Sequence, residues 1–160
     1  MEIFLEINRK GKFPNKEQLV KAMWGEDINF SISAFNLPLW KCDTFTLSWD
    51  KWLDDRRWSG LFGSKVNINF YLESDEELED RQIKLAYKQM MIEVENPVLL
   101  VDKKAVYQAA ILIADRCDGV ISLNKRDWLS IDEFKQVVEE TLRFTFKEAA
   151  EVSLKEAKRG

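Results

Sequence analysis

Four stretches of alternating apolar and polar residues fall within the first 72 positions, and they constrain the fold more than any other feature. Apolar side chains recur at every second position in residues 2–8, 28–34, 44–49 and 65–72. Successive side chains of a strand point to opposite faces, so this pattern predicts strands that are buried on one face and solvated on the other. Antiparallel sheets accommodate such a solvated face. We expect these strands to share one sheet, with the following side chains facing the helices: Ile3, Leu5, Val66, Ile68 and Phe70.

A short helix is expected between the first two strands. Asn15 and Gln18 have the spacing of a capping box, in which each side chain bonds the other residue's backbone N–H at the start of a helix. Gly25, directly after Trp24, marks the end of this helix, because glycine readily adopts the left-handed conformation that ends many helices.

The second half of the chain is predicted to be mostly helical. Residues 74–77, Ser-Asp-Glu-Glu, form a second capping box, and we expect the helix that begins there to run to about Glu95. Its buried stripe carries Ile83, Tyr87, Met90 and Val94. The apolar run at residues 97–101 predicts a central strand, so residues 98–123 would form a strand–helix–strand unit within the sheet.

Further signals predict the C-terminal elements. Asp102 can cap a helix whose residues 105–114 are nearly all apolar, and Gly119 can end that helix in the left-handed conformation. Residues 120–123 predict a strand. A third capping box begins at Ser130, and we expect the last helix to run from there toward the C-terminus and to fray beyond Glu151.

These elements together predict a fold of the α+β class. The expected architecture is a mainly antiparallel twisted sheet with helices packed largely on one face. A chain of 160 residues suits one domain with a sizeable core. Six glycines and three prolines leave little sequence for a flexible linker, so residues 1–160 are taken as a single α+β domain.

The chain contains no histidine, and this restricts its chemistry. Histidine is the usual general base near neutral pH and the commonest transition-metal ligand, so His-based triads and His-zinc sites are excluded. Cys42 and Cys117 match no metal or redox spacing, and no glycine-rich phosphate loop is present. We expect no catalytic residue, no metal and no cofactor, and a protein that acts by binding.

One enzymatic alternative stays open. Paired carboxylates can perform acid–base catalysis without histidine. Four aspartates occur near one another in the sequence, namely Asp43, Asp50, Asp54 and Asp55. A small hydrolase that uses two of these carboxylates is therefore the alternative to a binding protein.

The tryptophan-rich segment at residues 40–58 is the main candidate for a binding surface. Trp49 follows the alternation of its strand and should face the core. Trp52 and Trp58 lie beyond the alternation among mixed charges, a composition typical of binding hot spots. We assign Trp52, Arg56, Arg57 and Trp58 as candidate partner-binding residues. The alternative is that these tryptophans fold back onto the edge of the sheet.

A cluster of acids at residues 73–80 is a second candidate. Acids in the first turn of a helix stabilise it through the helix dipole, which explains part of the cluster. Six acids within eight positions exceed what capping needs. We therefore assign Glu76, Glu77 and Asp80 as a face that steers a basic protein partner. A metal site is the weaker alternative, because an exposed cluster lacks supporting hydrogen bonds.

Charge and hydropathy restrict the partners and the compartment. A net charge of −4 and a pI near 5.1 oppose non-specific binding to nucleic acid, which needs a basic surface. No apolar segment is long enough to span a membrane, and the acidic N-terminus does not resemble a signal peptide. We expect a cytoplasmic protein with reduced cysteines, no nucleic-acid partner and no membrane partner.

The C-terminal part of the chain resembles a known family. Residues 114–123, followed by Trp128 and residues 131–134, are similar to the closing helix–strand–helix of small bacterial α+β immunity proteins of polymorphic and contact-dependent toxin systems. The resemblance implies a cytoplasmic, non-enzymatic protein that binds a cognate toxin domain and neutralises it. A phage-type inhibitor and an acidic mimic of nucleic acid are further alternatives, and the oligomeric state is left open.

Overall fold

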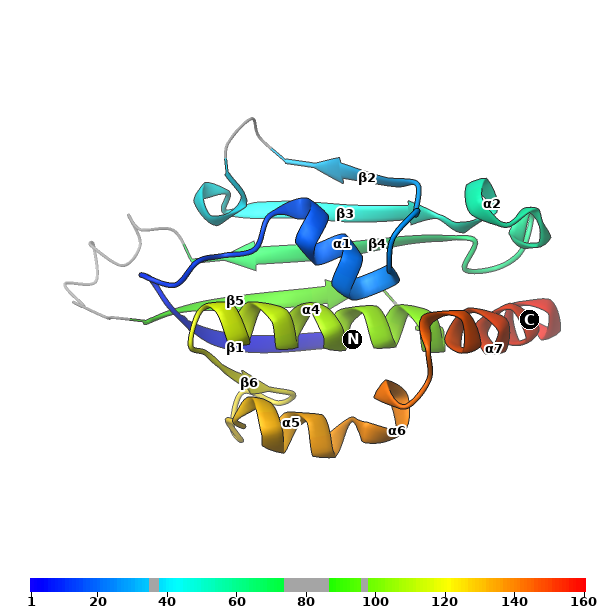
Figure 1. Cartoon of the computed structure of the whole chain (residues 1–160). Helices are drawn as coiled ribbons and strands as arrows, with labels where there is room; N and C mark the ends of the chain where they lie inside the picture. Colours follow the sequence, from blue (N-terminus) through cyan, green and yellow to red (C-terminus); the bar gives the residue numbers. More distant parts are fainter. Residues whose placement is uncertain (35–37, 74–86, 96–97) are drawn as a thin grey trace.

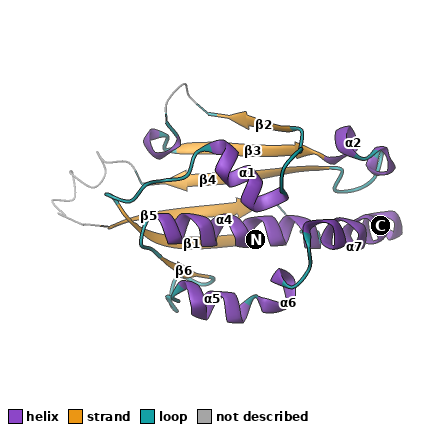
Figure 2. Cartoon of the chain, in the orientation of Figure 1, coloured by secondary structure: helices purple, strands orange, loops and turns teal. Residues whose placement is uncertain are grey.

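The computed structural model describes residues 1–34, 38–73, 87–95 and 98–160, and its centre is one six-stranded sheet (Figure 1). Every neighbouring pair of strands in this sheet is antiparallel, which confirms the α+β class (Figure 2). Across the sheet the order is β2 (Phe30–Ser33), β3 (Thr44–Asp50), β4 (Lys65–Leu72), β5 (Tyr87–Val94), β1 (Glu2–Asn8) and β6 (Val120–Ser122).

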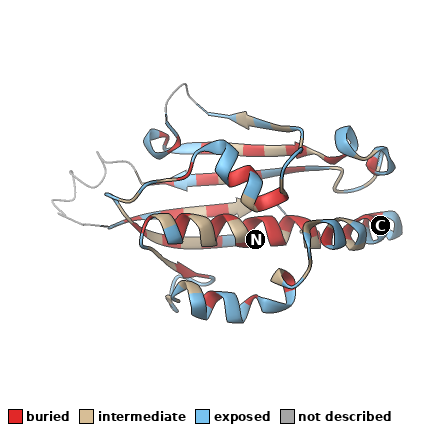
Figure 3. Cartoon of the chain, viewed as in Figure 1, coloured by how far each residue is buried: buried red, intermediate tan, exposed pale blue. Residues whose placement is uncertain are grey.

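The alternation predicted for the strands is present in their burial (Figure 3). The residues expected to face the helices are all buried: Ile3, Leu5, Val66, Ile68 and Phe70. The register of the strands aligns these buried residues across the sheet. Leu5 of β1, for example, lies opposite Met90 of β5 on one side and Ile121 of β6 on the other. The four strands expected from the alternation, now β1 to β4, therefore do share one sheet and one core-facing side.

Helices cover the core-facing side of this sheet (Figure 1). The central one is α4 (Leu100–Arg116), which packs against both α1 (Lys16–Trp24) and α7 (Phe146–Arg159). The capping box at the start of α1 is confirmed, because the Asn15 and Gln18 side chains each accept a hydrogen bond from the other residue's backbone N–H. In the described part of the chain, no helix combines the length and apolar character needed to cross a membrane.

The helix predicted to extend to Glu95 is wrong over its described part. Residues 87–94 form strand β5, which pairs with β1 and β4 in the middle of the sheet. Met90 and Val94 are four positions apart, so they fit the spacing of a helix face as well as that of a strand face. Ile92 lies between them and is also buried, and burial at every second position fits a strand and not one face of a helix. Residues 74–86 lie outside the described part of the chain.

The strand predicted at residues 97–101 is also wrong where the structure describes it, because α4 already begins at Leu100. Asp102 is not the cap but lies buried within the first turn, where Leu99 holds the N-cap position. At the other end of α4, Asp118 and not Gly119 has the left-handed backbone, with φ of 46°. Gly119 serves close packing instead, since a Cβ there would lie 2.7 Å from the carbonyl oxygen of Glu6.

The single long C-terminal helix that was predicted is divided into three: α5 (Ile131–Val137), α6 (Glu139–Leu142) and α7. Ser130 does cap α5, because its side chain accepts the backbone N–H of Glu133. Thr145 caps α7 in the same way through the N–H of Glu148. Fraying beyond Glu151 is contradicted as well, because α7 continues to Arg159 and buries Leu154 and Ala157.

The strand–helix–strand unit exists, but with a different first strand. β1 is antiparallel to both β5 and β6, so β5 and β6 are parallel to each other and β1 lies between them. Helix α4 connects the two parallel strands across the core-facing side of the sheet (Figure 1). The predicted unit was therefore shifted by one strand, because β5 was assigned to a helix.

Candidate protein-binding surface

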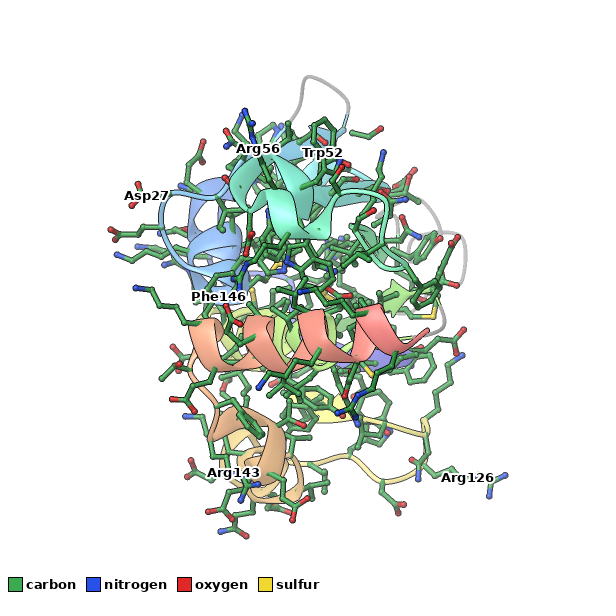
Figure 4. The ribbon with its side chains drawn as sticks, turned by 90° about the vertical axis from the view of Figure 1, so that its right-hand side faces the viewer. Asp27, Trp52, Arg56, Arg126, Arg143 and Phe146 are labelled. Carbon is green, nitrogen blue, oxygen red and sulfur yellow. The ribbon has the colours of Figure 1, made fainter. Side chains whose placement is uncertain are left out.

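The connection between β3 and β4 forms a compact unit at one end of the sheet (Figure 4). It contains the short helices α2 (Lys51–Asp54) and η2 (Arg56–Trp58), and we refer to residues 51–64 as the platform. A backbone hydrogen bond of 2.8 Å from the N–H of Lys51 to the carbonyl of Ser64 closes the connection at its base. Gly60 and Gly63, with φ of 74° and 72°, allow the chain to turn back toward β4.

A buried ion pair fixes the platform to helix α4. The Lys51 Nζ donates a hydrogen bond to the Asp102 Oδ2 at 3.0 Å, and the Oδ1 lies at the same distance without hydrogen-bond geometry. Burial lowers the pKa of Lys51 and raises the pKa of Asp102, while the attraction between the two charges opposes both shifts. Neither side chain is exposed by more than 5%, so this pair links parts of the interior and does not face a ligand.

The Lys51 ammonium is held by further groups of the platform. It donates a 2.7 Å hydrogen bond to the carbonyl of Gly63, and it lies 4.9 Å from the ring centroid of Trp58 and 5.7 Å from that of Trp49. The electron-rich faces of indole rings attract a desolvated cation. Lys51, Asp102, Trp49 and Trp58 thus form one buried cluster on the inner side of the platform.

Trp58 is buried and not available as an exposed anchor, which corrects its assignment to the binding surface. Only 2% of it is exposed, and it packs with Leu99, Leu154 and Ala157. Trp58 is therefore buried, as the alternative of tryptophans that fold back onto the edge of the sheet requires, but it packs against the start of α4 and against α7. Its partners lie about 40 and 100 residues later in the chain, so local sequence gave no signal of this burial.

Arg57 lies at the surface but is occupied by two carboxylates of the same chain. Its guanidinium donates a 2.7 Å hydrogen bond to Asp55 and forms an ion pair with Glu151 of α7. These hydrogen bonds lower the pKa of both carboxyls and raise the pKa of Arg57. The predicted binding role of Arg57 stays a prediction, and its visible contacts connect the platform to α7.

Asp54 adds a third set of links, toward β2 and β3. One oxygen accepts the indole N–H of Trp49 at 2.7 Å and the backbone N–H of Asn29 at 3.0 Å. The other oxygen accepts the side-chain amide of Asn29 at 2.7 Å. The platform is therefore attached to the sheet, to α4 and to α7 by separate polar contacts.

Large side chains lie exposed on the outer side of this fixed unit. Trp52 is 46% exposed, Leu53 is 51% exposed and Phe62 is 48% exposed. Arg56 is also exposed, and it projects from the platform close to Trp52 in the end-on view (Figure 4). Of the residues assigned from the sequence, Trp52 and Arg56 are thus both exposed on the platform.

Leu53 and Phe62 were missed by the sequence analysis. The residues around Leu53 are charged, and Phe62 lies between two glycines. Neither segment has a regular spacing of apolar residues, so the sequence did not distinguish these two exposed side chains from core residues. The acids assigned to steering, Glu76, Glu77 and Asp80, lie outside the described residues. Their role stays a prediction from the sequence.

The four aspartates of the enzymatic alternative have different surroundings. Asp54 and Asp55 accept the hydrogen bonds described above, Asp50 lies 4.0 Å from the Lys65 Nζ, and Asp43 is exposed. Within residues 1–34, 38–73, 87–95 and 98–160, no group of three or more Cys, Asp or Glu residues could hold a metal ion. Burial raises the pKa of the Cys117 thiol, which keeps it protonated.

The chain was also compared with known proteins. No protein-family model, no curated protein and no solved structure matches it.

Proposed function

We propose that this protein is a non-enzymatic binding protein, and that the outer side of the platform is its contact surface for a protein partner. The observation that supports this most is the exposure of Trp52, Leu53 and Phe62 on one short connection. Exposed large apolar side chains that occur in one short segment are a signal for an interaction site. Tryptophan and arginine are the residue types most enriched among interface hot spots, and Trp52 and Arg56 supply both.

The links beneath the platform favour the same proposal. Binding is weakened when loops and side chains must first become ordered. The contacts of Lys51, Asp54 and Arg57 hold the backbone of the platform in place before any partner arrives. A partner therefore meets a surface whose shape is already formed, and little ordering free energy opposes the association.

We propose further that the partner is a bacterial toxin domain, which this protein neutralises in the cytoplasm. This finer proposal rests on the resemblance of residues 114–123, Trp128 and residues 131–134 to small bacterial immunity proteins, and on the acidic net charge of −4. An acidic protein is attracted to a basic partner, and acids outside the contact surface accelerate the encounter.

The experiment begins with the purified chain as bait in extracts of its source cells. The captured protein is identified by mass spectrometry, and its isolated domain is expressed with and without this chain. We expect the domain to stop cell growth when expressed alone and to be harmless when the chain is co-expressed. Binding of the two purified proteins is then measured for wild type, Trp52→Ala and Phe62→Ala.

A matched control uses Val137→Ala, because Val137 is an apolar side chain on α5 that is 60% exposed and lies outside the platform. We expect this variant to bind as wild type does, while each platform variant loses about 2 kcal/mol of binding free energy. Unchanged binding by both platform variants would contradict the proposal that the platform is the contact surface. A partner that is not toxic when expressed alone would contradict only the proposal that the partner is a toxin.

A further inference from the structure

The two edges of the sheet differ in the part of the chain that the structure describes. At the β6 edge, Leu129 and Ile121 exchange two backbone hydrogen bonds of 2.8 and 3.0 Å, so the chain itself occupies that edge. At the other edge, β2 pairs with β3, and no described strand pairs with its outer side (Figure 1). An exposed strand edge presents N–H and C=O groups that can pair with another chain.

The hydrogen bonds of β3 show which of its residues bond to β4. In an antiparallel pair, opposite residues alternate between exchanging backbone hydrogen bonds and making none. The N–H of Leu72 donates to the carbonyl of Asp43, and the N–H of Lys51 donates to the carbonyl of Ser64. Both contacts continue the β3–β4 register, so the odd-numbered residues of β3 bond to β4 and the even-numbered residues bond to β2.

This alternation sets the direction of the backbone groups of β2. Ser31 and Ser33 lie opposite even-numbered residues of β3, so their N–H and C=O groups point toward β3. The N–H and C=O of Ile32 point the other way, as do the carbonyl of Phe30 and the N–H of Ala34. The Phe30 N–H donates to a carbonyl two residues earlier at 3.1 Å. β2 thus offers an outward row of donors and acceptors that another extended chain can match.

The β2 edge lacks two of the devices that protect exposed strands, namely charged side chains and proline. Residues 28–40 contain no charged residue, although 32% of the residues of the whole chain are charged. β2 itself contains no proline. The strand is also fixed at its start, because Asp54 accepts hydrogen bonds from the backbone N–H and the side-chain amide of Asn29. The outward row is therefore in place before a second chain binds.

A cavity of about 550 Å³ lies beside the end of β2. Ile32 and Ala34 line it together with the start of α1 and with Leu39. Ile32 lies opposite the buried Leu47, so its side chain is on the core-facing side of the sheet. Phe30 and Ala34 share that side, because each is two positions from Ile32. The cavity therefore has room for an apolar side chain of a chain that pairs with β2.

We propose that the β2 edge binds a second copy of this chain, with the two β2 strands antiparallel about a two-fold axis at Ile32. In this pairing the two Ile32 residues exchange backbone hydrogen bonds, and the Phe30 carbonyl of each copy accepts the Ala34 N–H of the other. The large Phe30 ring of one copy then lies opposite the small Ala34 of the other, beside the cavity that Ala34 lines. Two-fold symmetry brings the same patch of each copy together, and a patch without charges avoids like-charge repulsion.

The first test measures the oligomeric state of the full chain by sedimentation velocity. An interface this small is weak, so we expect a reversible dimer with a Kd on the order of 10–100 μM. Ile32→Pro should weaken dimerisation at least roughly tenfold, because proline lacks the outward N–H, which makes no bond to β3. The matched control Ile32→Val keeps that N–H and should dimerise as wild type does.

A second variant avoids any change to the backbone of β2. Ala34 is exposed, and Ala34→Glu would place a carboxylate opposite Phe30 of the second copy and weaken the dimer. Val137→Glu adds the same charge at an exposed position of α5 and should dimerise as wild type does. A chain that is monomeric at concentrations well above the expected Kd would overturn the proposal. A dimer that neither Ile32→Pro nor Ala34→Glu weakens would overturn it as well.

Cross-linking tests the register of the two strands. Opposite residues that exchange hydrogen bonds have Cα atoms about 5.5 Å apart, which a disulfide can bridge. Ile32→Cys should therefore form a disulfide-linked dimer under mild oxidation, while the native Cys42 and Cys117 are buried. Ser33→Cys is the control, because the proposed register places Ser33 opposite Ser31 of the second copy. Equal cross-linking of the two variants would overturn the two-fold axis at Ile32.

Discussion

The inner and outer sides of the platform differ in a way that residue type alone would not suggest. On the inner side a lysine, Lys51, is fully buried, together with an aspartate and two tryptophans. On the outer side a tryptophan, Trp52, is 46% exposed although it directly follows Lys51 in the same turn of α2. The polar residue is inside because Asp102, the Gly63 carbonyl and two rings receive it. The inner side therefore holds the platform in place, and the outer side is the part that we propose for binding.

The largest expected effect tests the inner side. Lys51→Ala should lower the free energy of unfolding by about 3–5 kcal/mol, because it leaves the Asp102 carboxylate buried without its counter-ion. Chemical denaturation of the purified variant measures this loss. The double variant Lys51→Met/Asp102→Leu should recover much of the stability, since it removes both charges together. A Lys51→Ala variant as stable as wild type would show that the pair does not hold the platform.

The next effect tests the outer side. Trp52→Ala should weaken partner binding by about 2 kcal/mol and change the free energy of unfolding by no more than about 0.5 kcal/mol. Partner titration and chemical denaturation of the same preparation measure the two quantities. A Trp52→Ala variant that is as destabilised as Lys51→Ala would erase the distinction between the two sides.

A smaller effect separates anchoring from steering. The triple variant Glu76→Gln/Glu77→Gln/Asp80→Gln should reduce the association rate several-fold at low salt and leave the dissociation rate nearly unchanged. Screening shortens the reach of charges, so the difference from wild type should disappear at roughly 0.5 M salt. Stopped-flow kinetics at two salt concentrations measure both rates. A change confined to the dissociation rate would place these acids in the contact surface.

The smallest effect concerns the link from the platform to α7. The Arg57 hydrogen bonds lower the pKa of Asp55 and Glu151 below their ordinary values of 3.8 and 4.5. A carboxyl with a lowered pKa in the folded state stabilises that state at neutral pH, and this stabilisation is lost as the pH falls through the lowered pKa. Arg57→Gln should therefore be slightly less stable than wild type at pH 7, and the difference should shrink below about pH 4.

The variant Arg56→Gln provides the control for that pH series. Arg56 is exposed on the same short helix, and its substitution removes the same charge. We expect its stability to follow wild type across the acid range in thermal unfolding. Identical pH profiles for the two variants would show that Arg57 acts only through net charge.

The sequence predicted the sheet well where apolar residues recur at every second position along the whole segment. The β1, β3 and β4 segments have this unbroken row, and each forms the strand expected of it. The β5 prediction failed because Lys88 interrupts the apolar core-facing row and Met90 and Val94 also fit a helical spacing, so only pairing with β1 and β4 decides for the strand. The break before α7 could have been found, since Thr145 and Glu148 have the spacing of a cap.

The candidate site was harder to predict for a physical reason. Exposure of Trp52 and burial of Trp58 depend on which distant elements reach the platform. Leu99 is the residue before α4, Asp102 comes from α4 and Leu154 from α7. The mixed charges and tryptophans at residues 49–58 indicated a binding surface, which stays a prediction. They did not indicate that Lys51 would be buried while Trp52 and Leu53 stayed exposed.

The most direct test of the account is oxidative footprinting of the tryptophans in the free chain and in the complex with its partner. Trp40 and Trp52 are 49% and 46% exposed and lie at opposite ends of β3, so each serves as the reference for the other. We predict that the partner protects Trp52 from oxidation and leaves Trp40 as reactive as before. Unchanged oxidation of Trp52 in the complex would contradict the assignment of the platform as the binding surface.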